Sequence, residues 1–296
     1  MKKAKWIWAN TPIRADEYVT FFDEFTYSSG KVKIDISVSG DYAVYLNGEL
    51  VLFGQYPDYE TYKVYDSVEI TPFLKQGKNE LRILCWYIGA DWLTSVKMPR
   101  GSIYEVYNES GVLCYSKSGG QCWVNQDYVS GQGKHITSQL GFSYLYDTRF
   151  MNGEKEFSFT VEVDGFDNLV LRQNKKTRFG EYVVAKLCDS KKRIYDLGKE
   201  CCGFLRFNFK ATAGEKVRVA FGEHLLDGKV RDIIDNRDFS VSFIGNGEMV
   251  DFTGVLRRLG CRYLEVYGPP DLDIAEIGIQ EVEYPFEVKP YEIDNQ

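Results

Sequence analysis

The chain has 296 residues, of which 44% are hydrophobic and 27% are charged, and its 36 Lys and Arg against 43 Asp and Glu give a formal net charge of −7. This balance is typical of a globular protein and excludes disordered, collagen-like and coiled-coil chains. The negative charge, without a basic patch, excludes a nucleic-acid-binding surface. No apolar run approaches about 18 residues, so we expect no membrane-spanning segment. The length predicts two domains, each large enough to bury a core.

Aromatic residues make up 15% of the chain, and they favour pleated, half-buried surfaces. The seven cysteines are odd in number and no pair has C-x-x-C spacing, which predicts free, buried thiols in a reducing compartment. The N-terminal run M-K-K-A-K-W-I-W lacks the apolar segment of a signal peptide. We therefore expect a cytoplasmic protein.

The first half of the chain carries the signals of β-strands. Residues 32–38 alternate between apolar and polar side chains, which predicts a strand with one buried face. Apolar runs at 42–46 and 49–53 flank Asn47-Gly48, a strong β-hairpin signal because both turn residues must tolerate positive φ. Further strands are predicted at residues 80–87, 102–108, 112–116 and 156–163, the last with Phe157, Phe159, Val161 and Val163 on one face.

The second half repeats the same pattern. Apolar residues alternate at 205–209 and 217–221, with a turn at Ala213-Gly214 between them, and further strands are predicted at residues 248–253, 262–267 and 274–283. Many short strands between Gly, Asn and Asp turns predict an all-β protein of two consecutive, jelly-roll-like β-sandwiches. The polar stretch 164–177 contains the predicted boundary, so the expected domains are residues 1–165 and 166–296.

Few catalytic constellations are possible, because the chain has only two histidines, His135 and His224, and neither lies in a recognisable motif. The sequence contains no nucleophile elbow, no metalloprotease helix motif and no phosphate-binding loop. The acidic segment 227–238 is interpreted as a solvated loop. We therefore expect no catalytic residue, no metal ligand and no cofactor in this chain.

Trp86 and Trp92 flank a turn-like segment of sequence I-G-A-D. An exposed aromatic ring beside polar groups can stack on the apolar face of a sugar, whereas a buried Trp packs in the core. Both interpretations stay open, and the first makes these two side chains candidate sugar contacts.

Residues 194–207, of sequence I-Y-D-L-G-K-E-C-C-G-F-L-R-F, resemble the signature Y-D-[L/F]-G-Q-N-x-x-G-[W/F] of the β-sandwich that precedes the catalytic domain of bacterial α-L-rhamnosidases. Residues 213–217, 221–228 and 260–266 continue the resemblance in the same order. In the first half, residues 5–8, 43–48 and 66–79 are similar to the N-terminal sandwich of that family. The resemblance covers nearly the whole chain.

This resemblance implies the N-terminal two-sandwich region of an α-L-rhamnosidase-like glycoside hydrolase, which supports a catalytic (α/α)₆ barrel and binds rhamnosides. In the family the catalytic acids belong to that barrel, so the chain alone should be inactive. The implied partners are glycans that contain L-rhamnose, together with the catalytic domain where the native chain is longer. A stand-alone carbohydrate-binding module is the alternative, and a purely structural role is a third interpretation, because fold alone does not choose among them.

Some members of this family bind rhamnose through a calcium site whose motif resembles Y-[DN]-G-E-x-Y-D-A-R. The aligned residues 140–149 keep Tyr146, Asp147 and Arg149 but lack the upstream acidic residues. Because Ca²⁺ takes about six to eight oxygen ligands, the loss of these acidic residues argues against a calcium site here and leaves calcium as the one alternative to a chain without cofactor. Tyr146, Asp147 and Arg149 remain candidate sugar contacts, with the ring stacking on the sugar and the charged groups binding its hydroxyls.

Overall fold

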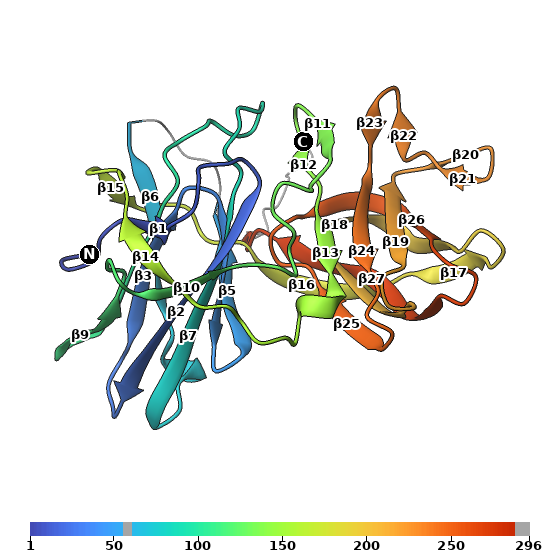
Figure 1. Cartoon of the computed structure of the whole chain (residues 1–296). Helices are drawn as coiled ribbons and strands as arrows, with labels where there is room; N and C mark the ends of the chain where they lie inside the picture. The colour runs from blue at the N-terminus through green and yellow to red at the C-terminus, as the bar shows by residue number, and fades with distance from the viewer. Residues whose placement is uncertain (56–60, 288–296) are drawn as a thin grey trace, which may run out of the picture.

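The computed structural model describes residues 1–55 and 61–287. In these residues the chain forms 27 strands and two single-turn 3-10 helices, η1 (Thr71–Phe73) and η2 (Thr148–Phe150), and no α-helix (Figure 1). The same part of the chain accordingly holds no helix long and apolar enough to cross a membrane. The prediction of an all-β protein built from β-sandwiches is confirmed.

The first sandwich is a curled sheet of twelve strands. β14 pairs with both β1 and β10, and it thereby joins a layer in the order β6-β3-β8-β1 to a layer in the order β10-β2-β7-β4-β5. Side chains such as Phe21, Ile34 and Ile83 form the core between the layers. The strands are β1 (Ile7–Ala9), β2 (Glu17–Tyr27), β3 (Lys33–Val38), β4 (Asp41–Leu46), β5 (Glu49–Gly54), β6 (Lys63–Glu69), β7 (Gly77–Tyr87), β8 (Ser102–Asn108), β9 (Gly111–Tyr115), β10 (Gln121–Val124), β14 (Ser158–Glu162) and β15 (Leu169–Leu171).

The hairpin predicted at Asn47-Gly48 is present between β4 and β5. Both turn residues have positive φ, 53° for Asn47 and 88° for Gly48, as a tight two-residue turn between twisted strands requires. The Asn47 side chain also donates to Oδ1 of Asn79 and accepts from the backbone N–H of Glu80. The turn is therefore tied to β7, the next strand of the layer.

The second sandwich is a sheet of nine strands around the long strand β18. Its core contains Phe207, Phe209, Phe243 and Phe252, whose rings pack against one another. The strands are β13 (Leu145–Asp147), β16 (Arg178–Val184), β17 (Lys186–Asp189), β18 (Ile194–Lys210), β19 (Lys216–Gly222), β24 (Ser240–Ile244), β25 (Met249–Thr253), β26 (Leu259–Tyr267) and β27 (Asp273–Glu283). Three two-stranded hairpins project from the sandwiches: β11 (His135–Thr137) with β12 (Gly141–Phe142), β20 (Leu225–Leu226) with β21 (Lys229–Val230), and β22 (Ile233–Ile234) with β23 (Arg237–Asp238).

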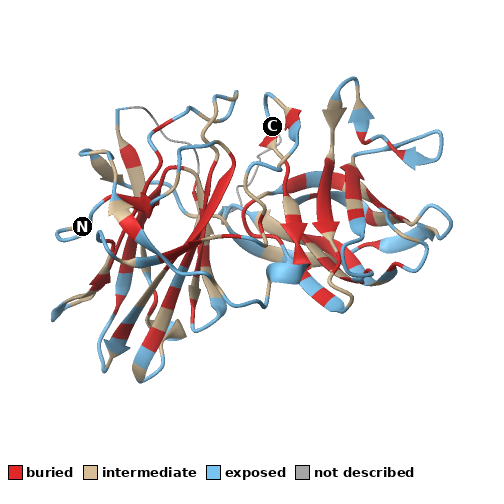
Figure 2. Ribbon diagram, viewed as in Figure 1, coloured by how far each residue is buried: buried red, intermediate tan, exposed pale blue. Residues whose placement is uncertain are grey.

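The two sandwiches meet along the outer face of β4 and β7. Alternate side chains of β7 point to opposite faces, so Cys85 lies in the first core while Leu84 and Trp86 belong to the apolar cluster of the second. Figure 2 shows buried residues both inside each sandwich and at the junction between them. The layer that contains β4 and β7 is therefore covered on both faces.

The chain passes between the sheets more than once. β13 pairs in parallel with β24 of the second sheet, after which β14 and β15 return to the first sheet, where β15 pairs with β6. Figure 1 shows β11, β12 and β13 beside the second sandwich. The division into residues 1–165 and 166–296 stays a prediction. Across this boundary, β13 belongs to the second sheet and β15 to the first.

The alternation of apolar residues around β14 predicts which side chains share a face of the strand, but not whether that face is buried. Phe157 and Phe159 share a side, as expected, but both are exposed: 53% of Phe157 and 66% of Phe159 are accessible to solvent. Val163 on the same side packs against the first core, and Thr160 on the opposite side is buried. The period-2 spacing of apolar residues thus predicts a strand, but it does not predict which face of the strand is covered.

Gly203 of β18 lies where two strands come close together. A Cβ atom at this position would stand 2.0 Å from the carbonyl oxygen of Gln280 in β27. We expect Gly203→Ala to force the strands apart and to lower the free energy of unfolding by about 1–3 kcal/mol, measured by chemical denaturation. Gly260→Ala is the matched control, because its Cβ would meet nothing within 4 Å. Equal stability of the two variants would contradict the close approach.

Candidate functional site

A cleft of about 720 Å³ lies between the two sandwiches, within the range of about 300–1,000 Å³ typical of ligand pockets. The first sandwich contributes Asp41, Phe53, Trp86 and the loop with Trp92, and residues 139–142 of the β11–β12 hairpin form a further part of the wall. The second sandwich contributes residues around Phe204 and the segment 255–258. The cleft thus combines aromatic surface with a few charged groups.

Trp86 lines this cleft but is almost fully buried. Its side chain is 2% exposed, its ring stacks on Tyr18 with the planes 2° apart, and its indole N–H donates to Oδ1 of Asp16 at 2.9 Å. Asp16 also accepts the backbone N–H of Gly133 at 2.8 Å, and burial raises the pKa of its carboxyl group. These contacts give Trp86 the packing of a core residue.

Trp92 lies in the loop after β7 and is half-buried. One face of its indole stacks on His135, with ring centroids 4.5 Å apart, and its edge meets Phe142. The indole N–H is shielded from solvent and has no hydrogen-bond partner among the described residues. A buried donor without an acceptor is costly, so this atom is a candidate contact for a ligand.

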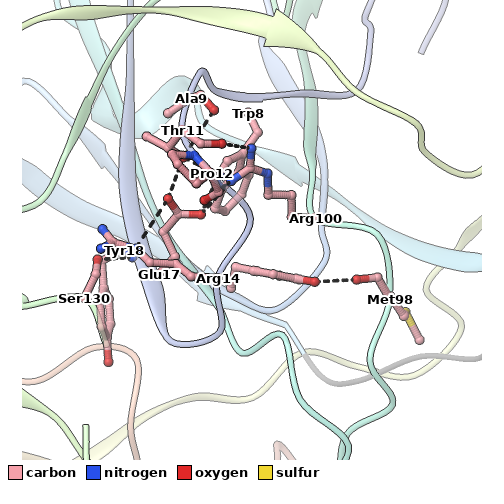
Figure 3. A network of polar contacts seen from close by, with 11 residues as sticks. Trp8, Ala9, Thr11, Pro12, Arg14, Glu17, Tyr18, Met98, Arg100 and Ser130 are labelled. Carbon is pink, nitrogen blue, oxygen red and sulfur yellow. Dashed lines mark hydrogen bonds and ion pairs between the residues drawn. The ribbon is translucent and has the colours of Figure 1, made fainter. Parts of the chain in front are cut away.

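The loop that carries Trp92 is fixed at its far end by a buried polar network (Figure 3). Arg100 forms an ion pair with Glu17 at 3.0 Å, and both side chains are nearly inaccessible to solvent. Glu17 also accepts from the indole N–H of Trp8 and the hydroxyl of Thr11. The hydroxyl of Tyr87 donates to the carbonyl of Met98 at 2.7 Å. The loop position is therefore determined by the first sandwich.

The other three predicted contacts lie away from the cleft. Tyr146 is 7% exposed and packs on Tyr128 and Phe252. Asp147 is buried and accepts hydrogen bonds from Nε and Nη2 of Arg149, at 2.9 and 2.7 Å. These hydrogen bonds raise the pKa of Arg149. The structure therefore brings Trp86 and Trp92 to one cleft and does not bring Tyr146, Asp147 or Arg149 there.

Asp41 and Arg257 are the cleft residues that sequence reasoning missed. Burial raises the pKa of Asp41 to about 7, against the opposing effect of Arg258 and Arg257. Burial also lowers the pKa of Arg257 to about 10. The only signal in the sequence is the pair Arg257-Arg258 inside the apolar stretch V-L-R-R-L, because Asp41 meets these two arginines only through the packing of segments that are far apart in the chain.

Ionisation of Asp41 is expected to destabilise the fold as pH rises. The folded chain holds this proton up to about pH 7, whereas a carboxyl with the ordinary value of 3.8 has lost it, so the free energy of unfolding falls between those pH values. Asp41→Asn removes the cost of ionising this carboxyl group. We expect the melting temperature of the variant to exceed that of the wild type by about 3 °C at pH 8 and to equal it at pH 4. Asp164→Asn, at an exposed position, should track the wild type at both pH values.

The cleft offers little for hydrolysis or metal binding. Among the described residues that line it, Asp41 is the only carboxylate, whereas glycoside hydrolysis uses a pair. The described part of the chain holds no group of three His, Cys, Asp or Glu side chains placed to bind a metal. The arrangement suits binding of a polar ligand with an apolar face.

Comparison with known proteins identifies the fold. Residues 186–281 match the family model of the bacterial α-L-rhamnosidase concanavalin-like domain. No curated protein matches the sequence.

Solved α-L-rhamnosidases share the fold. The enzyme from Aspergillus terreus superposes with a TM-score of 0.74 at 19% identity, over 97% of this chain and 37% of that one. The enzyme from Dictyoglomus thermophilum gives 0.71 at 16% identity, over 96% of this chain and 36% of that one. The Streptomyces avermitilis enzyme, solved with L-rhamnose, gives 0.70 at 17% identity, over 92% of this chain and 29% of that one.

The chain thus spans about a third of the length of these enzymes. The predicted resemblance is confirmed: residues 186–281 match the concanavalin-like domain of bacterial α-L-rhamnosidases, and the chain as a whole has the β-sandwich fold seen in solved α-L-rhamnosidases.

Proposed function

We propose that this chain is the non-catalytic two-sandwich region of an α-L-rhamnosidase-like glycoside hydrolase, and that it supports a catalytic (α/α)₆ barrel. The match of residues 186–281 to the family's concanavalin-like domain carries the proposal. The cytoplasm is the proposed location, with glycans that contain L-rhamnose as the ligands of the whole enzyme.

The chemistry of the cleft supports a role without catalysis. Inverting hydrolysis needs a general acid and a general base about 6.5–9.5 Å apart, with a water between them. Asp41 stands without a second carboxylate among the described residues of the cleft wall. A single acid cannot supply both roles.

The test is an assay of the purified chain with 4-nitrophenyl α-L-rhamnopyranoside. We expect no release of nitrophenolate above the buffer rate. Turnover that persists through further purification and is lost in Asp41→Asn would overturn the proposal.

A carbohydrate-binding module is the second candidate, and the cleft is the observation that favours it. Trp92 supplies an aromatic ring at its wall, Phe53 and Phe204 supply apolar surface, and Asp41 and Arg257 supply hydrogen-bonding groups. Sugar sites combine such apolar walls with a few placed polar groups. Titration with L-rhamnose should quench the fluorescence of Trp92, and Trp92→Phe should remove that signal. Unchanged fluorescence and melting temperature at millimolar rhamnose would exclude this candidate.

A further inference from the structure

Arg257 is a half-buried cation with no carboxylate in direct ion-pair contact among the described residues, and Asp41, which acts on it through its charge, has a pKa raised to about 7. One terminal nitrogen, Nη1, donates to the backbone carbonyl of Leu140. The Nε–H is shielded from solvent and has no partner in the described part of the chain. Buried charges in proteins are normally paired, so an anionic acceptor at this place would relieve the cost of burying the guanidinium group.

A second unsatisfied donor lines the same cleft. The indole Nε1–H of Trp92 is shielded and without an acceptor in the described residues, and Trp92 and Arg257 both belong to the cleft wall. Both orphan groups are donors only. The complementary ligand therefore presents acceptors, and a planar carboxylate matches a guanidinium group best.

The other residues of the cleft wall indicate which kind of molecule bears the carboxylate. Phe53, Phe204 and Leu256 supply apolar surface, which suits the face of a pyranose ring. The cleft volume of about 720 Å³ leaves room for one or two sugar rings.

We propose that the cleft binds a carboxylate-bearing saccharide, with Arg257 and Trp92 holding the carboxylate and the apolar wall packing on the ring. This inference rests on the proposed carbohydrate-binding role. It adds that an acidic sugar is preferred to a neutral sugar of the same shape.

Asp41 sets the pH range in which such a ligand binds. Arg258, Arg257, Lys63 and the backbone N–H of Gln55 face its carboxyl group, yet burial raises its pKa to about 7. Below that pH Asp41 is neutral and no longer repels a carboxylate. Affinity for an acidic sugar should therefore rise from pH 8 to pH 6, and this rise should vanish in Asp41→Asn.

The test is calorimetric titration of the full chain with methyl β-D-glucuronide, methyl β-D-glucoside and L-rhamnose at pH 6. We expect the glucuronide to bind at least about tenfold more tightly than the glucoside, because hydrogen bonds between charged groups are about twice as strong as those between neutral groups. Arg257→Gln and Trp92→Phe should each remove most of this preference. Arg82→Gln is the control, since Arg82 is exposed and pairs with Glu80 outside the cleft.

Circular dichroism and melting curves identify any variant that fails to fold. If Arg257→Gln does not fold, the comparison is made with Trp92→Phe, which keeps an aromatic ring. Equal affinity for the glucuronide and the glucoside, or binding of rhamnose without preference for the acid, would overturn the inference and leave the carbohydrate-binding role standing. Absence of binding by all three sugars would overturn both.

Discussion

Arg100→Met is expected to lower the free energy of unfolding by about 3–5 kcal/mol, because it removes the buried cation of Glu17 and leaves that carboxylate only the half-exposed Arg14, 3.9 Å away. Glu17 is fully inaccessible to solvent and pairs with Arg100 at 3.0 Å. The guanidinium group also donates to the hydroxyl of Thr11 and the carbonyl of Pro12 (Figure 3). Equilibrium denaturation in urea measures the loss.

Arg82→Met provides the matched control for this experiment. Arg82 lies on β7 in an exposed ion pair with Glu80, and such pairs contribute about 0–1 kcal/mol. A change of less than about 1 kcal/mol for Arg100→Met would contradict the role given to the buried network. Because Arg100 ends the loop that carries Trp92, the variant should also weaken saccharide binding in the cleft.

Asp66→Asn is expected to cost a similar amount, about 3–5 kcal/mol, since it removes the charge that pairs two cations. Asp66 is 1% exposed and accepts from Arg172, from Lys176 at 2.9 Å and from the hydroxyl of Tyr42. Arg172 and Lys176 belong to the segment that leads from β15 to β16. The substitution therefore loosens the connection between the sandwiches, and denaturation should show a lower midpoint.

The pH dependence of this network has the opposite sign to that of Asp41. Burial alone would raise the pKa of Asp66, but the hydrogen bond from Arg172 and the charge of Lys176 hold it below 3.8. The stabilisation is complete above about pH 4 and is lost as pH falls through the folded pKa. We expect the difference between wild type and Asp66→Asn to shrink in acid. A constant difference from pH 7 to pH 2 would contradict the pairing.

Alternating side chains predicted most strands because a period of two describes any strand with distinct faces. The alternation at residues 32–38 corresponds to β3 and that at 217–221 to β19. β2 (Glu17–Tyr27) was not predicted, because its run E-Y-V-T-F-F-D-E-F-T-Y places aromatic residues on both faces. That strand is covered on one side by the first core and on the other, through Tyr18, by the junction.

The site was less accessible to sequence reasoning than the fold. Trp86 and Trp92 were identified because aromatic rings beside a turn are visible locally, and both lie at the cleft. Asp41 and Arg257 face each other only because β4 packs on the segment after β25, and no local pattern encodes that contact. Tyr146 and Asp147 keep the motif but are buried in the protein, and the exposed Arg149 is held by Asp147.

The central claim is that the chain does not hydrolyse rhamnosides, and the second candidate function adds that its cleft binds them. Calorimetric titration of the purified chain with 4-nitrophenyl α-L-rhamnopyranoside tests this most directly, because binding gives heat that saturates and turnover gives heat that continues. We predict a saturating isotherm that is lost in Trp92→Phe, with no sustained heat flow. Sustained heat accompanied by release of nitrophenolate would contradict the central claim, and no heat at millimolar ligand would contradict binding in the cleft.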